Sequence, residues 1–414
     1  MNRIRRASAA AVCIAVVGAT AACSARSAES GATEGCSPGI TDTTLLLGGS
    51  LPMSGAAAVF GRQAAVAQAY FDDINAAGGV EMGDGHTRTV KLIAKDDAYD
   101  PARTVSNVRS LVEQDNVFGL FQVLGTSPNL AIADYVSAHG IPNLIATTGS
   151  DEILAHHDTN PWTIALAPQY NFEAEVISDY ILDKLPEAKV AILYQNDGFG
   201  KQMLANFHKQ FDGTSARIVA EQGYEQSGGS VDSQMTSLAN SGADVFLNYA
   251  SGTFVTQAFK KKGELRWDAM TALTSTATYT SLLAPAGSGA NDIVAAALFK
   301  DVSGAASATD PGVQAWSTFA AKHNFDATDD TAAVGYSNAQ IMIKVLEGMS
   351  GCTRQAMLDS ATSLKDIRSD LTPPGVTIST TPRYPYLMSQ IRLKDFNDGQ
   401  WVFQDELYNH ESRN

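Results

Sequence analysis

The sequence predicts an α/β protein with two lobes, each a parallel sheet covered by helices, and a ligand cleft between the lobes. Three observations carry this prediction. Short apolar runs alternate with segments in which apolar residues recur at helical spacing. The alternation starts near residue 44 and restarts after residue 168. The length of 414 residues is also enough for two or three domains.

The chain begins with a pattern typical of an export signal. Three arginines among the first six residues precede a run of small and apolar residues, 7–22, which ends at Cys23. The run is shorter than the roughly 20 residues that a membrane-spanning helix needs, so we predict that residues 1–22 are a signal peptide. The sequence Thr20-Ala21-Ala22-Cys23 is similar to a bacterial lipobox, which predicts lipidation of Cys23. A cleaved signal followed by an incidental cysteine is the alternative.

The composition after the signal predicts where the protein is located. Residues 23–37 are rich in Ala, Ser, Glu, Gly and Thr, which predicts a lipidated, flexible tether. No later segment is long and apolar enough to cross a membrane. We therefore expect an exported protein that is held at the outer face of the cell membrane by its N-terminal lipid. The net charge of −15 argues against nucleic acid as a partner.

The four cysteines divide into two groups. Cys13 lies in the predicted signal and Cys23 at the predicted lipid site, which leaves Cys36 and Cys352. In an exported protein two remaining cysteines can pair, so we predict a disulfide between them. Two unpaired cysteines are the alternative.

The first lobe begins with a short apolar strand at residues 45–49. Apolar residues then recur at helical spacing through residues 66–74, and Gly78-Gly79 ends that helix. Asp100-Pro101 has the composition of a helix N-cap and first helical residue. Further strands are predicted at residues 90–94, 117–124 and 143–147, and further helices at 101–112 and 128–139.

The second lobe repeats the alternation and ends in a hairpin. Helices are predicted at residues 172–185, 201–211, 231–241 and 254–262, and strands at 190–194, 218–222, 244–249 and 270–274. A further amphipathic helix is predicted in the C-terminal part, at residues 336–349. The turn Asn397-Asp398-Gly399 between residues 390–396 and 400–404 is a strong hairpin signal. We predict that residues 38–168 and 302–374 form the first lobe, and residues 169–301 and 375–414 the second.

Loops that follow the strands are the expected site, because parallel sheets bind ligands at the carboxyl ends of their strands. In the loop 124–129, free amides at a helix start and the hydroxyls of Thr126 and Ser127 could form a neutral cradle for a carboxylate. A plain N-cap at Ser127 with Pro128 at the first helical position is the alternative. Residues 145–150 form a second hydroxyl-rich loop, and Phe60 is either an apolar wall or core.

Signatures of catalysis are not found in the sequence. It contains no Gly-x-Ser-x-Gly elbow and no phosphate-binding loop with Gly-Lys-Ser/Thr. His156 and His157 are adjacent, and neighbouring histidines rarely bind one metal ion. We therefore expect neither an enzyme, nor a cofactor, nor a metal site.

Several segments, taken in order along the chain, resemble the Leu/Ile/Val-binding family. They are Met53-Ser54-Gly55, residues 71–80 and 95–101, Tyr194–Lys201 and residues 241–246. The family consists of type I periplasmic binding proteins. The resemblance implies two Rossmann-like lobes joined by hinge crossings, a small-molecule ligand held by lobe closure, and delivery to the permease of an ABC importer. We expect a monomer.

The resemblance also implies site residues. Hydroxyls and amides for a ligand carboxylate fall on Thr126 and on the loop Ala146-Thr147-Thr148-Gly149, and aromatic or polar side chains fall on Phe60, Phe199 and Ser251. Tyr170 could help Phe60 and Phe199 to enclose an apolar body. Positions that often form a disulfide in the amino-acid binders are Tyr99 and Leu124 here, so that bond cannot form.

One departure from the family suggests the type of ligand. The acid that the amino-acid binders direct at the ligand's α-ammonium falls near Ser275, and the loop Thr274-Ser275-Thr276 contains no acid. A buried ammonium without a carboxylate partner is costly. We therefore predict an aromatic or aliphatic acid without an α-amine. A sensory subunit, a binder of branched-chain amino acids and a hydrolase with an unfamiliar site are the alternatives.

Overall fold

The structure is a computed structural model, and it describes residues 35–412. These residues belong to one compact unit. The predicted signal peptide 1–22, the predicted lipid site Cys23 and most of the tether 23–37 lie outside the described residues. Within residues 35–412, no helix combines the length and apolar character needed to cross a membrane.

The first sheet has the strand order β2-β3-β1-β4-β5-β6. Its strands are β1 (Thr44–Leu51), β2 (Val80–Glu81), β3 (Thr87–Asp96), β4 (Gly119–Phe121), β5 (Asn143–Ala146) and β6 (Thr163–Ala165). All pairs are parallel except β2 with β3. The carboxyl ends of β1, β4, β5 and β6 therefore lie along one edge of the sheet.

The second sheet has the order β13-β12-β11-β10-β9-β7-β8. Its strands are β7 (Lys189–Gln195), β8 (Arg217–Tyr224), β9 (Val245–Tyr249), β10 (Met270–Leu273), β11 (Ile293–Ala296), β12 (Gln390–Asn397) and β13 (Gln400–Asn409). The first five are mutually parallel, and β12 and β13 are antiparallel. Asp398 and Gly399 both have positive φ in the β12–β13 turn, as the predicted hairpin requires.

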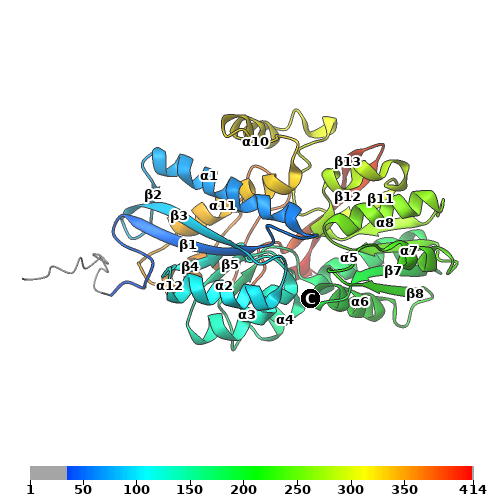
Figure 1. The fold of residues 1–414 in the computed structure, drawn as a ribbon, viewed down its shortest axis with the longest axis horizontal. Helices are drawn as coiled ribbons and strands as arrows, with labels where there is room; N and C mark the ends of the chain where they lie inside the picture. The colour runs from blue at the N-terminus through cyan, green and yellow to red at the C-terminus, as the bar shows by residue number, and fades with distance from the viewer. Residues whose placement is uncertain (1–34, 413–414) are drawn as a thin grey trace, which may run out of the picture. The chain divides into compact units, whose positions relative to one another are not determined.

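Helices cover both faces of each sheet (Figure 1). On the first sheet, α1 (Arg62–Ala76) and α11 (Asp330–Glu347) pack together on one face, while α2 (Pro101–Glu113) and α3 (Thr126–Ala138) bury the other. On the second sheet, α5 (Tyr170–Lys184) and α6 (Gly198–Phe211) share a core with β7 and β9. The helices α7 (Asp232–Ala239) and α8 (Thr253–Glu264) contribute to the opposite core. The predicted α/β fold class is confirmed.

The chain crosses between the sheets three times: after β6, after β11 on the way to α11, and before β12. The lobe boundaries predicted at residues 168, 301 and 374 fall in these crossings, but the exact boundaries stay a prediction. Elements not predicted from the sequence include β6, β11, α4 (Asp151–Ala155), α9 (Thr280–Leu283), α10 (Pro311–Lys322) and α12 (Arg354–Ala361). Most of them are short, so their periodicity is a weak signal.

The start of α3 corrects one prediction. We predicted a helix at residues 128–139, with an N-cap at Ser127 as one interpretation of the loop before it, but the helix begins at Thr126 and Gly125 is its N-cap residue. Gly125 has φ 104°, which an L side chain rarely adopts. The Ser127 hydroxyl is therefore free of a capping role, and it accepts a hydrogen bond from the amide of Gly198 instead.

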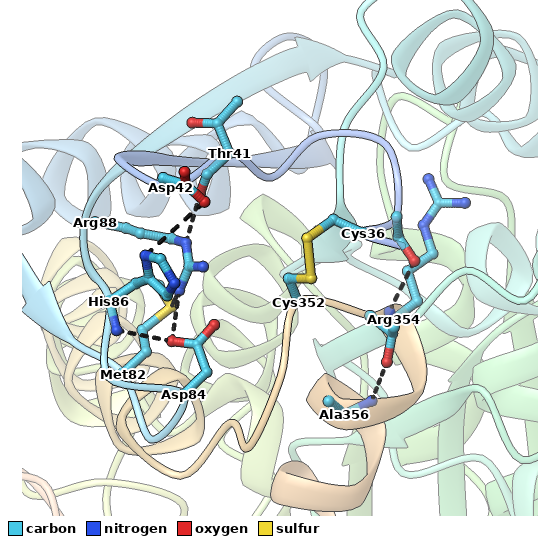
Figure 2. Close-up of a disulfide and its surroundings, with 12 residues drawn as sticks. Cys36, Thr41, Asp42, Met82, Asp84, His86, Arg88, Cys352, Arg354 and Ala356 are labelled. Atoms are coloured by element: carbon cyan, nitrogen blue, oxygen red, sulfur yellow. Dashed lines mark hydrogen bonds and ion pairs between the residues drawn. A yellow bond between two sulfur atoms is a disulfide. The ribbon is translucent and has the colours of Figure 1, made fainter. Parts of the chain in front are cut away.

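The described chain start is attached to the first sheet by a disulfide and by a buried arginine (Figure 2). Cys36 is bonded to Cys352, which lies between α11 and α12. Arg88 is 1 % exposed and forms an ion pair with Asp84 at 2.8 Å, while its Nε donates to the carbonyl of Thr41. These contacts hold the segment before β1 against β3 and the loop after β2.

Candidate ligand-binding site

A pocket lies where strands of both sheets end. Fifteen residues line it: Phe60, Gln63, Tyr99, Leu124, Gly125, Thr126, Thr147, Leu166, Tyr170, Phe199, Ser251, Thr276, Tyr279, Leu298 and Val334. None of these residues is Asp, Glu, Lys, Arg or His. The lining is therefore apolar and aromatic, with a few hydroxyls and one amide, which is the composition expected for a small, largely apolar ligand.

Three hydroxyl groups form a cluster at the start of α3. Thr126 Oγ1 lies 2.9 Å from Thr148 Oγ1 and 2.9 Å from the Tyr170 hydroxyl, and Thr148 Oγ1 lies 3.4 Å from that hydroxyl. Burial raises the pKa of Tyr170 to about 12, so its phenol is neutral at physiological pH. The cluster positions the Thr126 side chain at the pocket wall.

The first turn of α3 adds hydrogen-bond donors to the same wall. The amides of Thr126 and Ser127 have no carbonyl one turn earlier in the helix to which they could donate. The 13-residue helix also places the positive end of its dipole there. Thr147 Oγ1, beside this helix start, is buried and has no hydrogen-bond partner within the described chain. This wall can accept an anionic or hydrogen-bonding group.

Aromatic rings from both sheets enclose the pocket. The ring of Phe60, which follows β1, lies 5.9 Å from the ring of Tyr279, which follows β10. Tyr170 and Phe199 are 5.5 Å apart between ring centroids. All four side chains are less than 8 % exposed. They can enclose an aliphatic or aromatic body.

The surroundings of Ser275 correct the second prediction. We predicted that no acid lies near Ser275, but the carboxylate of Glu173, from the first turn of α5, lies against it. Glu173 Oε2 accepts from Ser275 Oγ at 2.5 Å, and Oε1 accepts from the Ser275 amide at 3.0 Å. Burial raises the pKa of Glu173, and the hydrogen bonds from Ser275 oppose that effect. Because both oxygens are occupied and neither residue lines the pocket, this acid is directed at the protein itself.

A buried charged cluster lies behind Tyr279 and Leu298. A small cavity is lined by Lys394, Asp301 and Asp330. Tyr279 and Leu298 line both this cavity and the ligand pocket. Lys394 Nζ lies 4.4 Å from the centre of the Trp401 ring, and burial lowers the pKa of Lys394 to about 8. Asp330 accepts hydrogen bonds from the hydroxyl and amide of Ser281, and burial raises its pKa to about 6. Because these pKa values differ from those of the unfolded chain, the free energy of unfolding of the protein depends on pH.

We expect Asp330→Asn to remove a pH-dependent part of the stability. The pKa of Asp330 is higher in the folded protein than the ordinary value of about 3.9, so the folded state binds this proton more tightly. Wild-type stability relative to Asp330→Asn should therefore increase by about 2 kcal/mol as the pH falls from 7.5 to 4. Urea unfolding at several pH values measures this difference. A difference that stays constant over the same range would contradict the expectation.

Asp197 connects segments of the two lobes beside the pocket-lining residues Tyr99 and Phe199. It is the N-cap of α6, where its Oδ1 accepts from the amides of Phe199 and Gly200. Its Oδ2 accepts from the hydroxyl of Tyr99, which follows β3, at 3.2 Å and from Oγ of Ser127, in the first turn of α3, at 3.4 Å. Burial raises the pKa of Asp197. The carboxylate therefore joins segments that follow β3 and β4 of the first sheet to the start of α6, which follows β7 of the second.

Some of the predicted ligand-binding residues line the pocket and others lie behind it. Those that line it are Phe60, Thr126, Thr147, Tyr170, Phe199 and Ser251. Those that do not are Ser127, Ala146, Thr148, Gly149 and Ser275. Thr148 and Gly149 support Tyr170, through a hydroxyl and through the Gly149 carbonyl that accepts from the Tyr170 amide. Ala146 is the buried last residue of β5.

Sequence reasoning missed several lining residues: Gln63, Tyr99, Leu124, Gly125, Leu166, Thr276, Tyr279, Leu298 and Val334. Val334 comes from α11, which the prediction started later, at residue 336. Leu298 follows β11, which was not predicted. Gln63 carried no distinguishing signal, because it is one polar residue at the start of an alanine-rich helical stretch after Phe60.

Comparison with known proteins gives consistent results. Residues 44–392 match the family described as periplasmic binding protein. An amino acid binding protein of Pseudomonas aeruginosa is 26% identical over 49% of this chain and 52% of its own length. A Leu/Ile/Val-binding protein homolog 7 of Brucella suis is 23% identical over 51% of this chain and 53% of its own length. The chain thus spans about half the length of these curated relatives.

Solved structures share the fold. A fatty acid ABC transporter substrate-binding protein from Thermomonospora curvata has a TM-score of 0.74 at 18% identity, covering 90% of this chain and 94% of that one. A branched chain amino acid ABC transporter from Thermus thermophilus with bound valine has a TM-score of 0.75 at 16% identity, covering 89% and 96%. At these identities the likeness shows the fold alone.

Proposed function

The chain belongs to the periplasmic binding protein family, and from that premise we propose that it is the ligand-capturing subunit of an ABC importer. It binds a small carboxylate-bearing ligand without an α-amine, an aromatic or aliphatic acid, and delivers it to a membrane permease without chemical turnover. The N-terminal pattern supports export and anchoring by a lipid on Cys23. The protein acts as a monomer.

The pocket lining is the observation that carries this proposal. The wall formed by Thr126, Thr147 and the first amides of α3 offers hydrogen-bond donors for a ligand carboxylate. These donors are all neutral, because no charged side chain lines the pocket. The aromatic pairs Phe60–Tyr279 and Tyr170–Phe199 line the pocket and can contact the apolar part of the ligand. The fatty acid transporter protein that shares the fold is compatible with such a ligand.

An α-ammonium group would have no charged partner in this pocket. The nearby carboxylates of Glu173 and Asp330 already accept hydrogen bonds from Ser275 and Ser281, respectively, and neither carboxylate lines the pocket. Burying an ammonium there would leave its charge uncompensated. This argument replaces the simpler one from the missing acid in the loop 274–276, and it leads to the same ligand class.

Thermal-shift screening followed by calorimetry tests the ligand class. We expect hexanoate and 3-phenylpropanoate to raise the melting temperature, because a ligand that binds only the native state stabilises it by mass action. Leucine and phenylalanine, which carry the α-amine, should produce smaller shifts at equal concentration. Tight binding of leucine or valine would refute the amine-free assignment.

Thr126→Val tests the wall formed by Thr126, Thr147 and the first amides of α3, which we call the carboxylate wall. The substitution keeps the shape of the side chain and removes the hydroxyl that contacts Thr148 and Tyr170. We expect the affinity for the best acid to fall about tenfold, since a hydrogen bond to a charged group contributes about 1.5–3 kcal/mol. Thr236→Val on the exposed face of α7 is the matched control and should bind normally. Unchanged affinity in Thr126→Val would argue against this wall as the carboxylate site.

A further inference from the structure

Gln63 is a polar residue of the pocket that the carboxylate wall does not use. It lies in the first turn of α1, directly after the short helix η1 (Ala58–Gly61) that carries Phe60. Its side chain is 1 % exposed and lines the pocket. A Cβ added to Gly335 of α11 would lie 2.2 Å from the Gln63 carbonyl oxygen, so the two helices are in close backbone contact here. The position of Gln63 is therefore set by rigid packing.

The side-chain oxygen of Gln63 is not satisfied by the protein. Its Oε1 is buried and has no hydrogen-bond partner among the described residues. Gln195, a glutamine beside the same pocket, differs in this respect. Its Nε2 donates to Asp197 at 2.7 Å, and its Oε1 accepts from Ser251 Oγ and from the Tyr224 hydroxyl. Gln195 therefore has a structural role, whereas Gln63 lines the pocket and keeps an acceptor atom that no described residue uses.

An unpaired buried polar atom is unfavourable, and a hydrogen-bond donor on a ligand in the pocket would satisfy Gln63 Oε1. Thr147 Oγ1 is a second buried, unpaired polar atom on the same lining. A glutamine amide offers both an acceptor and donors, and it carries no charge. Its best partner is a group that also donates and accepts, such as a hydroxyl or a primary amide.

Charged partners fit this position poorly. No Lys, Arg or His lines the pocket, so a second carboxylate would be buried without a counter-charge. No Asp or Glu lines it either, so an ammonium would lack a counter-charge as well. Only a neutral polar group satisfies Gln63 without that penalty.

We propose that Gln63 is a specificity-determining residue that selects acids bearing an additional uncharged hydroxyl or amide group. This inference rests on the proposed function, since it assumes that the carboxylate of the ligand binds at the carboxylate wall. The ligand class thereby narrows from aromatic or aliphatic acids to their hydroxylated or amide-bearing forms.

Calorimetry with matched ligand pairs tests the inference on the full exported chain. The pairs are 3-phenylpropanoate with 3-(4-hydroxyphenyl)propanoate, and hexanoate with 6-hydroxyhexanoate, and the dicarboxylate adipate is added. In the wild type, at least one hydroxylated acid should bind about tenfold more tightly than its parent. Adipate should bind more weakly than hexanoate.

Gln63→Met keeps the length and volume of the side chain and removes its polar end. We expect this variant to bind the parent acid as the wild type does and to lose the preference for the hydroxylated acid. Gln257→Met is the matched control, because Gln257 Oε1 is also buried and unpaired but the residue does not line the pocket. If Gln63→Met fails to fold by circular dichroism, Gln63→Leu takes its place in the same comparison.

The outcomes separate this inference from the proposed function. If acids bind and Gln63→Met leaves the hydroxyl preference unchanged, or if no hydroxylated acid is preferred, the inference is wrong and the proposed function stands. If no acid binds the wild type, the proposed function is wrong and the inference is overturned with it. If leucine binds in preference to all the amine-free acids and Gln63→Met abolishes that binding, Gln63 binds an ammonium group. That result would overturn both this inference and the proposed ligand class.

Discussion

Replacing Cys36 and Cys352 together with serine is expected to lower the free energy of unfolding by about 4 kcal/mol. The bridge connects residues 316 positions apart, so its loss frees a very long loop in the unfolded chain. In the folded protein the same segments remain in contact, because the Ser37 amide donates to the Cys352 carbonyl and the Ser37 hydroxyl accepts from the Arg354 amide. The variant should therefore fold natively and be less stable.

Urea unfolding of the oxidised wild type and the double variant measures this effect. The reduced wild type is the control, and it should unfold at the same urea concentration as the variant. Ligand binding should be retained, since no pocket-lining residue lies in residues 35–43 or 348–360. Equal stability of the oxidised wild type and the variant would mean that the bridge does not constrain the unfolded chain.

Gly149→Ala is expected to destabilise the protein by about 3 kcal/mol and to weaken ligand binding more than tenfold. A Cβ at residue 149 would lie 2.0 Å from the Pro168 carbonyl oxygen and 2.8 Å from the Tyr170 ring. The backbone before α5 must shift to relieve this clash, and Tyr170 shifts with it. Because Tyr170 lines the pocket and bonds to Thr126, the carboxylate wall is distorted.

Thermal unfolding and calorimetry with 3-phenylpropanoate test this expectation. Gly229→Ala is the matched control, because a Cβ there meets no atom within 4 Å and the residue does not have positive φ. That variant should match the wild type in both measurements. Normal binding by Gly149→Ala would show that the loop after β5 can move without disturbing Tyr170.

Much of the fold could be predicted because its signals are local. The helix after Asp100-Pro101 begins at Pro101, with Asp100 accepting from the Ala102 amide, as the N-cap pattern predicted. The hairpin at Asp398-Gly399 formed for a similar reason, since positive φ at both residues matches the twist of the strands. The strand predicted at 117–124 is shorter, Gly119–Phe121, because Gln122 adopts φ 58° and leaves the strand conformation.

The candidate site was predictable where a loop directly follows a strand. Thr126, Thr147 and Ser251 come after β4, β5 and β9, so strand order alone places them at one edge of each sheet. Gln63 could not be predicted as a pocket residue, because it lies in a helix and faces the pocket only through the packing of α1 on α11.

The α/β class, the repeated strand and helix pattern and the hydroxyl-rich loops follow from the amino-acid sequence, because residues two to four positions apart carry that information. Which of these groups share a desolvated space depends on the tertiary fold. Glu173 contacts Ser275 across 102 residues of sequence. The absence of an acid from the loop 274–276 therefore did not mean the absence of an acid beside it, since contacts between distant segments depend on how the chain crosses between the two sheets.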